Sequence, residues 1–342
     1  MIAPKRLDDK RRAALKILYL APHAPSPDTP KPPAIHPDFG VQPAYQYEIC
    51  DVLRNGLGLD VVSLSDLSAV PQAFEGRNYV FSLYNIAPFR NSEIYVSALA
   101  ARAGIACMGA PANIRALAED KWLTKLAAQA VGLPTPAGKP FGPGVPLQRP
   151  DFDGPYIAKP RFGAASTGID AESAHEEFDA VAERVAALGA SIDECLVEQV
   201  FGDFDVTVPI LVGENGPVAL PAATQTCDSP YGLFTHRQKR RLAPGLVRDF
   251  PGDEPWLPPI VEDALRFARA VGPYDYLRCD FRVGPEGHAF LEFNLACSIG
   301  SAMAFAQCAG RVGISSEALV EHILATSLDR QWGQGASEPL PT

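Results

Sequence analysis

The sequence lacks the features that mark several large classes of protein. No stretch of its 342 residues approaches the roughly 20 consecutive apolar residues of a membrane-spanning helix. The seven cysteines show no C-x-x-C pair and no zinc-binding spacing, so we expect reduced core residues in a cytoplasmic protein. Neither common nucleotide-binding fingerprint, G-x-x-x-x-G-K-[ST] or G-x-G-x-x-G, is present.

Positive charge is also scarce. The chain has 30 Lys and Arg residues against 40 Asp and Glu residues, and its net charge of −10 argues against nucleic acid as the main partner. The apolar run near the N-terminus is short and interrupted by Lys16, which favours a first β-strand over a signal peptide and predicts no membrane partner. A hydrophobic content of 47% and a charged content of 20% are typical of a soluble globular protein of two or three domains.

The first third of the chain alternates predicted strands with predicted helices. Three apolar runs predict buried strands, at 16–21, 59–64 and 79–83. Helical patterns cover 44–54 and 92–104, so we expect a parallel sheet in an α/β domain over residues 1–110. The Pro-rich loop at 22–40 is long for a connection, and such loops are usually functional lids or disordered segments.

The remainder mixes helices and strands without an internal repeat. Predicted helices lie at 121–132, 174–189, 261–271 and 315–328, and predicted strands at 156–160, 194–201 and 204–213. Residues 141–155 are rich in Pro and Gly and predict a linker or a set of turns, and residues 224–242 predict a polar loop.

Residues 277–294 predict a β-hairpin with one buried face, because apolar and polar residues alternate on both sides of a Gly-Pro-Glu-Gly turn. The register that keeps the polar residues together sets Asp280 opposite Glu292, around a five-residue turn. It also sets Arg278 opposite Asn294. Opposed carboxylates repel unless a cation lies between them, and with the Asn294 amide oxygen they form a donor set suited to Mg²⁺. A solvated outer face of an edge hairpin is the alternative.

Two loops are candidates for binding anions. The small-residue loop at 161–168 follows the strand that contains Lys159, and its backbone N–H groups can cradle phosphate oxygens or close over a triphosphate. Its AASTG segment lacks the first glycine and the immediate helix of a hydrolase nucleophile elbow, so serine hydrolysis is not favoured. The cation-rich run at 236–241 predicts contact with an anionic substrate or phosphate, with an ordinary solvated surface as the alternative.

In order and spacing, the chain resembles the ATP-grasp superfamily and, within it, the D-alanine–D-alanine ligase-like enzymes. The matching stretches are EDKWLTKLAAQAVGLPTP (119–136), YIAKPRFGAASTGI (156–169), CLVEQVFGDFDVTVPIL (195–211) and LRCDFRVGPEGHAFLEFN (277–294). The resemblance implies an ATP-grasp fold of mixed α/β and α+β class, in which the N-terminal parallel α/β domain precedes two lobes, 111–192 and 193–342, that sandwich ATP.

The resemblance also implies roles for individual residues. The implied nucleotide-binding residues are Lys121, Lys159, Ser166, Glu198, Gln199, Val200, Phe201, Asp205 and Lys239. The implied metal ligands are Asp280, Glu292 and Asn294. Arg278, beside the reacting carboxylate, and Ser166, in the glycine-rich lid, are the implied catalytic residues. Taken from the residues alone, Glu198 and Asp205 could hold an adenine amine and ribose hydroxyls or could be ordinary polar strand ends.

The implied chemistry is amide formation from small, amino-acid-like substrates. ATP phosphorylates a carboxylate to an acyl phosphate, and an amine then displaces phosphate to give an amide. Two Mg²⁺ ions, with Mn²⁺ as a substitute, would neutralise the transferring phosphoryl group. Arg278 would stabilise the oxyanion of the tetrahedral intermediate.

The chain departs from the family in two places. D-alanine ligases carry G-G-x-S-x-E-x-x-V-S after the first strand, where this chain has the 22–40 loop, and Ser-Pro-Gly after Glu-x-Asn, where it has 295–298 (LACS). These departures predict intact nucleotide chemistry with rebuilt substrate recognition, and the surplus of cations favours a substrate with a second anionic group. The alternatives are a true D-alanine–D-alanine ligase with an atypical first loop and an ATP-binding regulatory protein. The assembly stays open, with a homodimer as the candidate, as do the roles of the 22–40 and 231–242 loops.

Overall fold

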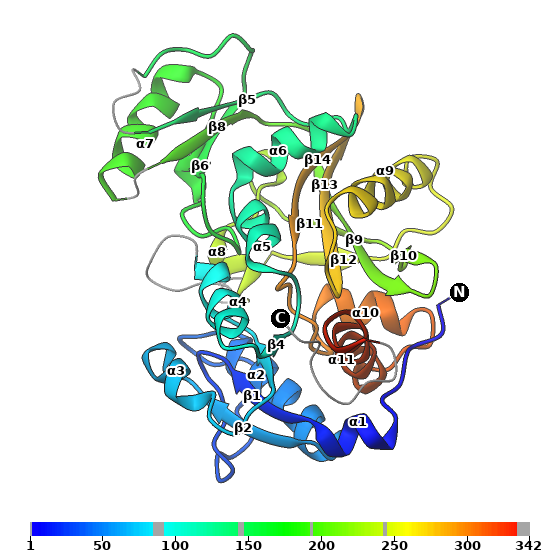
Figure 1. Ribbon diagram of the computed structural model, residues 1–342. Coiled ribbons are helices and arrows are strands. Elements are labelled where there is room, and N and C mark those ends of the chain that lie inside the picture. Colours follow the sequence, from blue (N-terminus) through cyan, green and yellow to red (C-terminus); the bar gives the residue numbers. More distant parts are fainter. Residues whose placement is uncertain (1, 85–91, 143–146, 192–193, 242–244, 334–342) are drawn as a thin grey trace.

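A computed structural model describes residues 2–84, 92–142, 147–191, 194–241 and 245–333 (Figure 1). Three sheets with their helices form the molecule, with one four-stranded sheet at each end and a six-stranded sheet between them. This arrangement confirms the predicted mixed α/β and α+β class.

The N-terminal sheet is parallel, in the order β2-β1-β3-β4. Its strands are β1 (Lys16–Leu20), β2 (Asp60–Leu64), β3 (Tyr79–Ser82) and β4 (Ala106–Cys107). The accompanying helices are α1 (Asp9–Ala14), α2 (Gln42–Asp51, extended by a π-helical turn, Val52–Gly56), α3 (Val70–Ala73) and α4 (Ser92–Arg102). The segment 22–40 contains no helix or strand and only an isolated bridge between His36 and Gly40. The predicted strands and the long first loop are therefore confirmed.

The central lobe is built on an antiparallel sheet in the order β5-β8-β6-β7. Its strands are β5 (Gly138–Phe141), β6 (Tyr156–Pro160), β7 (Ala174–His175) and β8 (Cys195–Gln199), and α7 (Phe178–Ser191) packs on the sheet. Two helices lead into it, α5 (Ala112–Glu119) and α6 (Lys121–Ala130). Because β8 pairs with both β5 and β6, this sheet extends past the boundary predicted at residue 192 and ends at Gln199.

The C-terminal lobe contains the six-stranded sheet, in the order β12-β11-β9-β13-β14, with β10 paired to β9. Its strands are β9 (Phe204–Gly213), β10 (Gly216–Ala219), β11 (Ala223–Thr226), β12 (Val247–Asp249), β13 (Tyr276–Gly284) and β14 (Gly287–Asn294), and α9 (Leu257–Ala270) covers one face. The polar loop predicted at 224–242 is wrong in part. Its start belongs to β11, a polar strand held by β9 on one side and β12 on the other, and it also contains the short helix α8 (His236–Lys239).

The β13–β14 hairpin has the predicted register at its open end only. Asp280 pairs with Glu292, as expected, but a bulge after Asp280 pairs Phe281 with Phe290 and shortens the predicted five-residue turn to two residues. The bulge has a packing cause. It moves Phe290 into the core, fully buried with its ring centroid 4.5 Å from that of Phe267, while Leu291 lines a cavity beside Glu292.

The last two helices, α10 (Ala304–Gly310) and α11 (Ser316–Trp332), pack against the N-terminal domain. One hydrophobic core contains residues of β1, β3, α2 and α11 (Figure 1). Ion pairs reinforce this packing, because Glu321 of α11 binds Arg6 at 2.6 Å and Arg12 at 2.8 Å. Asp329 of the same helix binds Lys5 at 2.7 Å. Both ends of the chain therefore contribute to one unit.

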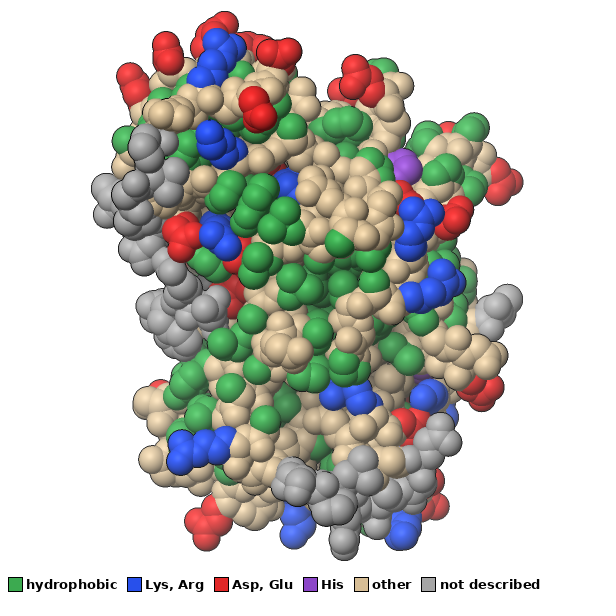
Figure 2. Space-filling view, turned by 45° about the horizontal axis from the view of Figure 1, so that its top comes forward, with side chains coloured by type: hydrophobic (Ala, Val, Ile, Leu, Met, Phe, Trp, Pro, Cys, Tyr) green, Lys and Arg blue, Asp and Glu red, His purple; other side chains and the backbone are tan. Residues whose placement is uncertain are grey.

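Figure 2 shows hydrophobic side chains gathered across the middle of this face, with most charged side chains around its margin. On α6, Leu123 and Leu126 are both more than 40% exposed. Within the described ranges, no helix combines the length and apolar character needed to cross a membrane.

The aromatic contact between α9 and the hairpin generates a stability prediction. Phe267 is fully buried, with ring centroids 4.5 Å from Phe290 and 5.0 Å from Phe293. We expect Phe267→Ala to destabilise the C-terminal lobe by about 3–5 kcal/mol and to lower the calorimetric unfolding midpoint by several degrees. Leu126→Ala removes an exposed leucine and should leave the midpoint nearly unchanged. Equal shifts in the two variants would contradict this packing role.

Candidate functional site

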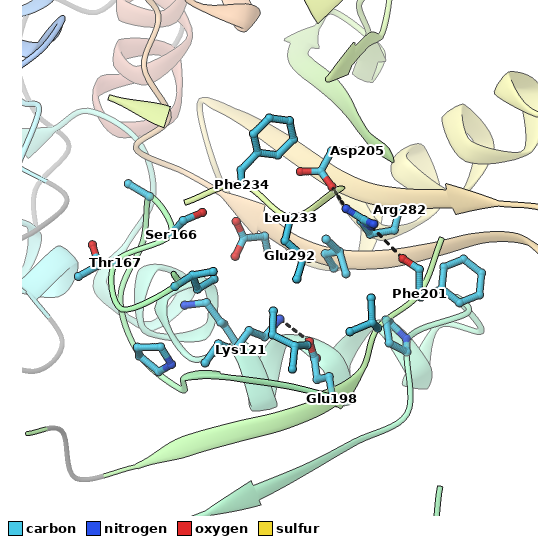
Figure 3. A pocket seen from close by; sticks show the side chains of 18 of the residues that line it. Lys121, Ser166, Thr167, Glu198, Phe201, Asp205, Leu233, Phe234, Arg282 and Glu292 are labelled. Carbon is cyan, nitrogen blue, oxygen red and sulfur yellow. Dashed lines mark hydrogen bonds and ion pairs between the residues drawn. The ribbon is translucent and has the colours of Figure 1, made fainter. Parts of the chain in front are cut away.

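Two adjoining cavities lie between the central lobe and the β13–β14 hairpin. The first, of about 800 Å³, is enclosed by β6, β8 and the 161–168 loop (Figure 3). The second, of about 1090 Å³, extends from the open end of the hairpin toward α2. Six residues line both cavities, Ala164, Ala165, Asp205, Lys239, Leu291 and Glu292. We call this shared region the junction.

The structure brings the predicted site residues together at these cavities. The first cavity is lined by Lys121, Lys159, Ser166, Glu198, Gln199, Val200, Phe201, Asp205 and Lys239. The second is lined by Arg278, Asp280, Glu292 and Asn294. These residues come from five separate stretches of sequence, so their convergence supports a single site, while the role of each remains a prediction.

Glu198 is bound by two lysines rather than left open to the cavity. Its carboxylate pairs with Lys159 of β6 and, at 2.8 Å, with Lys125 of α6. Burial would raise the pKa of this carboxyl group, but the two ammonium groups outweigh burial and lower the pKa to about 2. The side chain therefore holds Lys159 in place.

The hinge after β8 presents backbone atoms and apolar side chains to the first cavity. The Val200 N–H donates to the Pro155 carbonyl at 2.7 Å, whereas the Phe201 N–H has no acceptor among the described residues. Apolar side chains form the cavity walls, among them Ile157, Val200, Phe201, Leu233, Phe234 and Leu291. A slot with apolar walls and a free backbone donor suits a flat, nitrogen-containing ring.

Arg282 joins the hinge to a second loop, a role that the sequence analysis missed. Its buried guanidinium donates to the carbonyl oxygens of Phe201 (2.9 Å), Gly202, Tyr231 and Gly232. It also pairs with Asp205 at 3.1 Å (Figure 3). The alternation that places Arg278 and Asp280 on one face of β13 includes Arg282, so the period-two pattern contained the signal.

The 161–168 loop, the predicted lid, lies against neighbouring elements. The Lys121 ammonium donates to the Gly163 carbonyl, and burial lowers the pKa of this lysine against the opposing effect of Glu292. Ala165 and Ser166 have φ angles of +56° and +55°, a conformation that costs energy in residues other than glycine and is often stored at functional sites.

The lid also meets the 231–241 loop. The Ala165 carbonyl lies 3.0 Å from Nδ1 of His236 in α8, and the Tyr231 hydroxyl donates to Glu176 of the central lobe at 2.6 Å. The 161–168 loop therefore contacts the 231–241 loop through His236, and the 231–241 loop also contacts the central lobe through Tyr231.

Glu292 is the free carboxylate of the junction. It forms no hydrogen bond or ion pair with any described residue and lines both cavities. Burial raises its pKa, but Lys121, Lys239 and Lys159 surround it and the net shift is downward, so it is held ionised. An ionised and unpaired carboxylate among lysines suits a ligand that brings its own cation.

Asp280, in contrast, is already engaged. Arg278 donates to it through Nε at 2.9 Å, Thr207 through Oγ1 at 2.8 Å and Asn294 through Nδ2 at 3.0 Å. Among the described residues no group of three or more His, Cys, Asp or Glu side chains could hold a metal ion. The donor set is therefore two carboxylates and the Asn294 amide oxygen. These hard oxygen donors fit Mg²⁺, which takes few protein ligands and completes its shell with phosphates and water.

No family model matches the sequence. The D-alanine–D-alanine ligase of Gloeobacter violaceus is 28% identical over 242 residues, which cover 66% of this chain and 74% of that protein. D-alanine–D-alanine ligase B of Xanthomonas campestris is 26% identical over 294 residues, covering 82% and 88%. These homologues confirm the resemblance inferred from the motifs.

Solved structures agree on the fold. The D-alanine–D-alanine ligase of Bacillus anthracis complexed with ATP superimposes with a TM-score of 0.71 at 16% identity, covering 92% of this chain and 98% of that one. The VanG D-Ala:D-Ser ligase of Enterococcus faecalis gives a TM-score of 0.66 at 15% identity, covering 92% and 99%. The predicted ATP-grasp fold is thereby confirmed.

The Lys125–Glu198–Lys159 cluster generates a pH-dependent prediction. Glu198→Gln leaves two buried ammonium groups without their carboxylate, and breaking a buried pair typically costs about 3–5 kcal/mol. Because the pKa of Glu198 is lowered to about 2 in the folded state, its contribution is complete above the ordinary carboxyl pKa and disappears as pH falls toward 2. The gap in thermal midpoint between parent and variant should be widest near pH 7 and narrow below about pH 4.5.

The control for this prediction is Asp60→Asn, which removes an ion pair with Arg77 whose carboxylate is 52% exposed. That gap should be small at every pH. A gap for Glu198→Gln that stays constant from pH 7 to pH 4 would contradict the cluster's role.

Proposed function

We propose that the protein is an ATP-dependent, ADP-forming carboxylate–amine ligase that joins two amino-acid-like molecules through an acyl phosphate. The observation that carries this proposal is the junction, where Glu292 and Lys239 face a cavity suited to a nucleotide and a cavity suited to a small anionic substrate. A phosphoryl group bound at the junction would lie between ATP in the first cavity, which donates it, and the substrate carboxylate in the second cavity, which accepts it. The similarity to D-alanine–D-alanine ligases supports the same reaction class.

ATP would occupy the first cavity. Its base would lie in the apolar slot against Phe234 and Leu291, with the Phe201 N–H as donor to a ring nitrogen, and its ribose near Asp205. The salt bridge to Arg282 fixes the Asp205 carboxylate in orientation while leaving it at the cavity wall. The triphosphate would then run along Lys121, Lys159 and Lys239 toward Glu292.

Positively charged side chains of the protein would stabilise the negative charge of the phosphates during the reaction. Lys159, held by Glu198, and Lys121, held by the Gly163 carbonyl, present fixed positive charge to the phosphates without reorganising during the reaction. The lid would exclude water, and backbone N–H groups around Ser166 would contact phosphate oxygens. Asp280, Glu292 and Asn294 would hold Mg²⁺, which would supply neutralisation of the charge that develops on the phosphates.

Arg278 would act on the acceptor. Its Nε and Nη2 bind Asp280, an anchoring that orients the guanidinium at the second cavity. There it would hold the reacting carboxylate in line with the phosphoryl group and stabilise the oxyanion formed when the amine attacks the acyl phosphate.

A D-alanine–D-alanine ligase with an atypical first loop is the second candidate, and the sequence similarity to enzymes of that name favours it. The comparisons give no support to a regulatory ATP-binding protein without ligation. We propose a three-part organisation with the central lobe extended to Gln199, together with a cytoplasmic location and a homodimer. A screen of ADP and phosphate release over amino acids, singly and in pairs, with ATP and Mg²⁺, tests the function directly. Absence of release with every pair would contradict it.

Loss of the free junction carboxylate should abolish ligation. Glu292→Gln removes the one unpaired acid between the two cavities, and we expect kcat to fall by about 10²-fold or more while the fold is retained. ADP release, measured across a Mg²⁺ titration, checks the change. The matched control is Glu286→Gln in the exposed turn of the same hairpin, which should behave like the parent. Parent-like turnover of Glu292→Gln at moderate Mg²⁺ would refute the metal assignment.

Nucleotide should protect the two loops that meet over the first cavity. Residues 161–168 and 231–241 have few buried apolar side chains and contact each other through the His236 ring, so they should open readily without ligand. Hydrogen exchange with a non-hydrolysable ATP analogue and Mg²⁺ should slow at both loops and stay unchanged in the core strand β9. Equal exchange at both loops with and without the analogue would count against closure over a nucleotide.

A further inference from the structure

The second cavity holds positive charge that ATP binding does not require. Arg240, Arg248 and Arg278 line it and do not line the first cavity. The lysines that would serve the phosphates, Lys121 and Lys159, lie on the opposite side of the junction. The three arginines therefore face whatever occupies the substrate side.

Two of these arginines have no anionic partner among the described residues. Arg278 is neutralised by Asp280, but neither Arg240 nor Arg248 forms an ion pair there, and the Nε atom of each is buried without a hydrogen-bond acceptor. Arg248 donates to two neutral oxygens, those of Ala302 (3.2 Å) and Gln307 (2.8 Å). A buried and unpaired guanidinium is costly, so its presence at a cavity wall points to a ligand that completes it.

The acids of the same cavity do not fill this need. Asp205 is bound to Arg282, Asp280 is bound to Arg278, and Glu292 lies at the junction among lysines. Burial lowers the pKa of Arg240 and Arg248, and for Arg248 the nearby charges of Arg241 and Arg278 act in the same direction. The cluster is therefore a site of net positive charge within an acidic protein.

The unusual first loop shapes this part of the cavity. It ends at Gly40, where a Cβ atom would lie 2.0 Å from the Arg240 carbonyl oxygen, so only glycine permits the approach. The next residues, Val41 and Gln42, begin the ten-residue helix α2 and line the cavity. The positive end of that helix thus faces the same space as the unpaired arginines. The loop that replaces the family's substrate-binding motif is packed onto the arginine cluster.

We infer that one substrate is a dicarboxylate, an amino acid of the aspartate or glutamate class, and that Arg240 and Arg248 hold its second carboxylate. Its reacting carboxylate lies beside Arg278 at the junction, and the two guanidinium groups supply the charge-assisted hydrogen bonds that a neutral side chain cannot use. This inference rests on the proposed ligase function and specifies the substrate that the site selects.

The first test compares near-isosteric acids and amides. Aspartate with asparagine, and glutamate with glutamine, are supplied as both enantiomers with ATP, Mg²⁺ and hydroxylamine. Hydroxylamine replaces the unknown amine: the carboxylate takes the γ-phosphoryl group with release of ADP, and hydroxylamine displaces phosphate to give a hydroxamate. We expect at least one acid to exceed its amide about 10- to 100-fold in kcat/KM and to exceed D-alanine.

Variants then locate the selectivity. Arg240→Gln and Arg248→Gln should each raise KM for that acid about 10- to 100-fold and leave KM for ATP within twofold. Arg248→Lys should recover part of the loss because it retains the charge. The matched control is Arg237→Gln, an exposed arginine of the same loop that lines neither cavity, and its kinetics should match the parent. Circular dichroism and ATP binding verify that each variant is folded.

A neutral amino acid as the best substrate would overturn the inference while leaving the ligase function intact. So would equal effects of Arg240→Gln and Arg248→Gln on ATP and amino-acid kinetics. If no carboxylate supports ADP release, the proposed function fails. The inference about Arg240 and Arg248 is then tested separately, by measuring the binding of a dicarboxylate and a monocarboxylate. Succinate should then raise the thermal midpoint more than butyrate does, with the difference lost in Arg248→Gln. No difference between the two probes would overturn it.

Discussion

The bulge after Asp280 is the constraint on which both the core and the site depend. A regular hairpin would alternate faces throughout, so Phe290 and Glu292 would point the same way. One extra residue in β14 breaks that alternation, because Phe290 then packs with Phe267 while Leu291 and Glu292 both reach the cavities. The most deeply packed aromatic cluster of the C-terminal lobe therefore fixes the position of the carboxylate proposed to hold the metal.

The two cavities of the site differ in how their positively charged side chains are paired with acids. At the nucleotide end two of the cations have acidic partners: Lys159 has Glu198, and Arg282 has Asp205. At the substrate end, Arg240 and Arg248 have none among the described residues. Paired cations maintain geometry whatever is bound, whereas unpaired cations gain most of their stabilisation from the ligand. The proposed nucleotide end thus has part of its charge fixed before a ligand binds, whereas the proposed substrate end depends on its ligand for neutralisation.

Features that depend on neighbouring residues could be predicted from the sequence, whereas features that depend on contacts between distant residues could not. The strands at 156–160 and 204–213 match β6 and β9 to the residue, because their apolar runs are local and bounded by turn residues. The strand β5 was not predicted, because Gly138 and Pro140 are unfavourable in a strand, yet it pairs along β8. Tertiary pairing outweighs local preference there.

The site shows the same division. Motif spacing was enough to gather the lysines, the hinge and the hairpin acids. It could not reveal that Glu198 turns inward to Lys125, since that contact joins residues 73 positions apart. The sequence was equally unable to show that Arg248 has no acidic partner among the described residues, because the lack of a partner is a property of the surroundings rather than of the residue. Arg282 is different, since it lies on a face that the alternation already identified as polar.

The joining of α11 to the N-terminal sheet has a consequence for biosynthesis. Leu319 and Ile323 of α11 share one core with Ile17 of β1. Glu321 of α11 forms ion pairs with Arg6 and Arg12. The N-terminal sheet therefore lacks part of its interior until α11 has been synthesised. Apolar side chains of this sheet that pack on α11 therefore stay exposed, and accessible to chaperones, while the segments between β4 and α11 are translated.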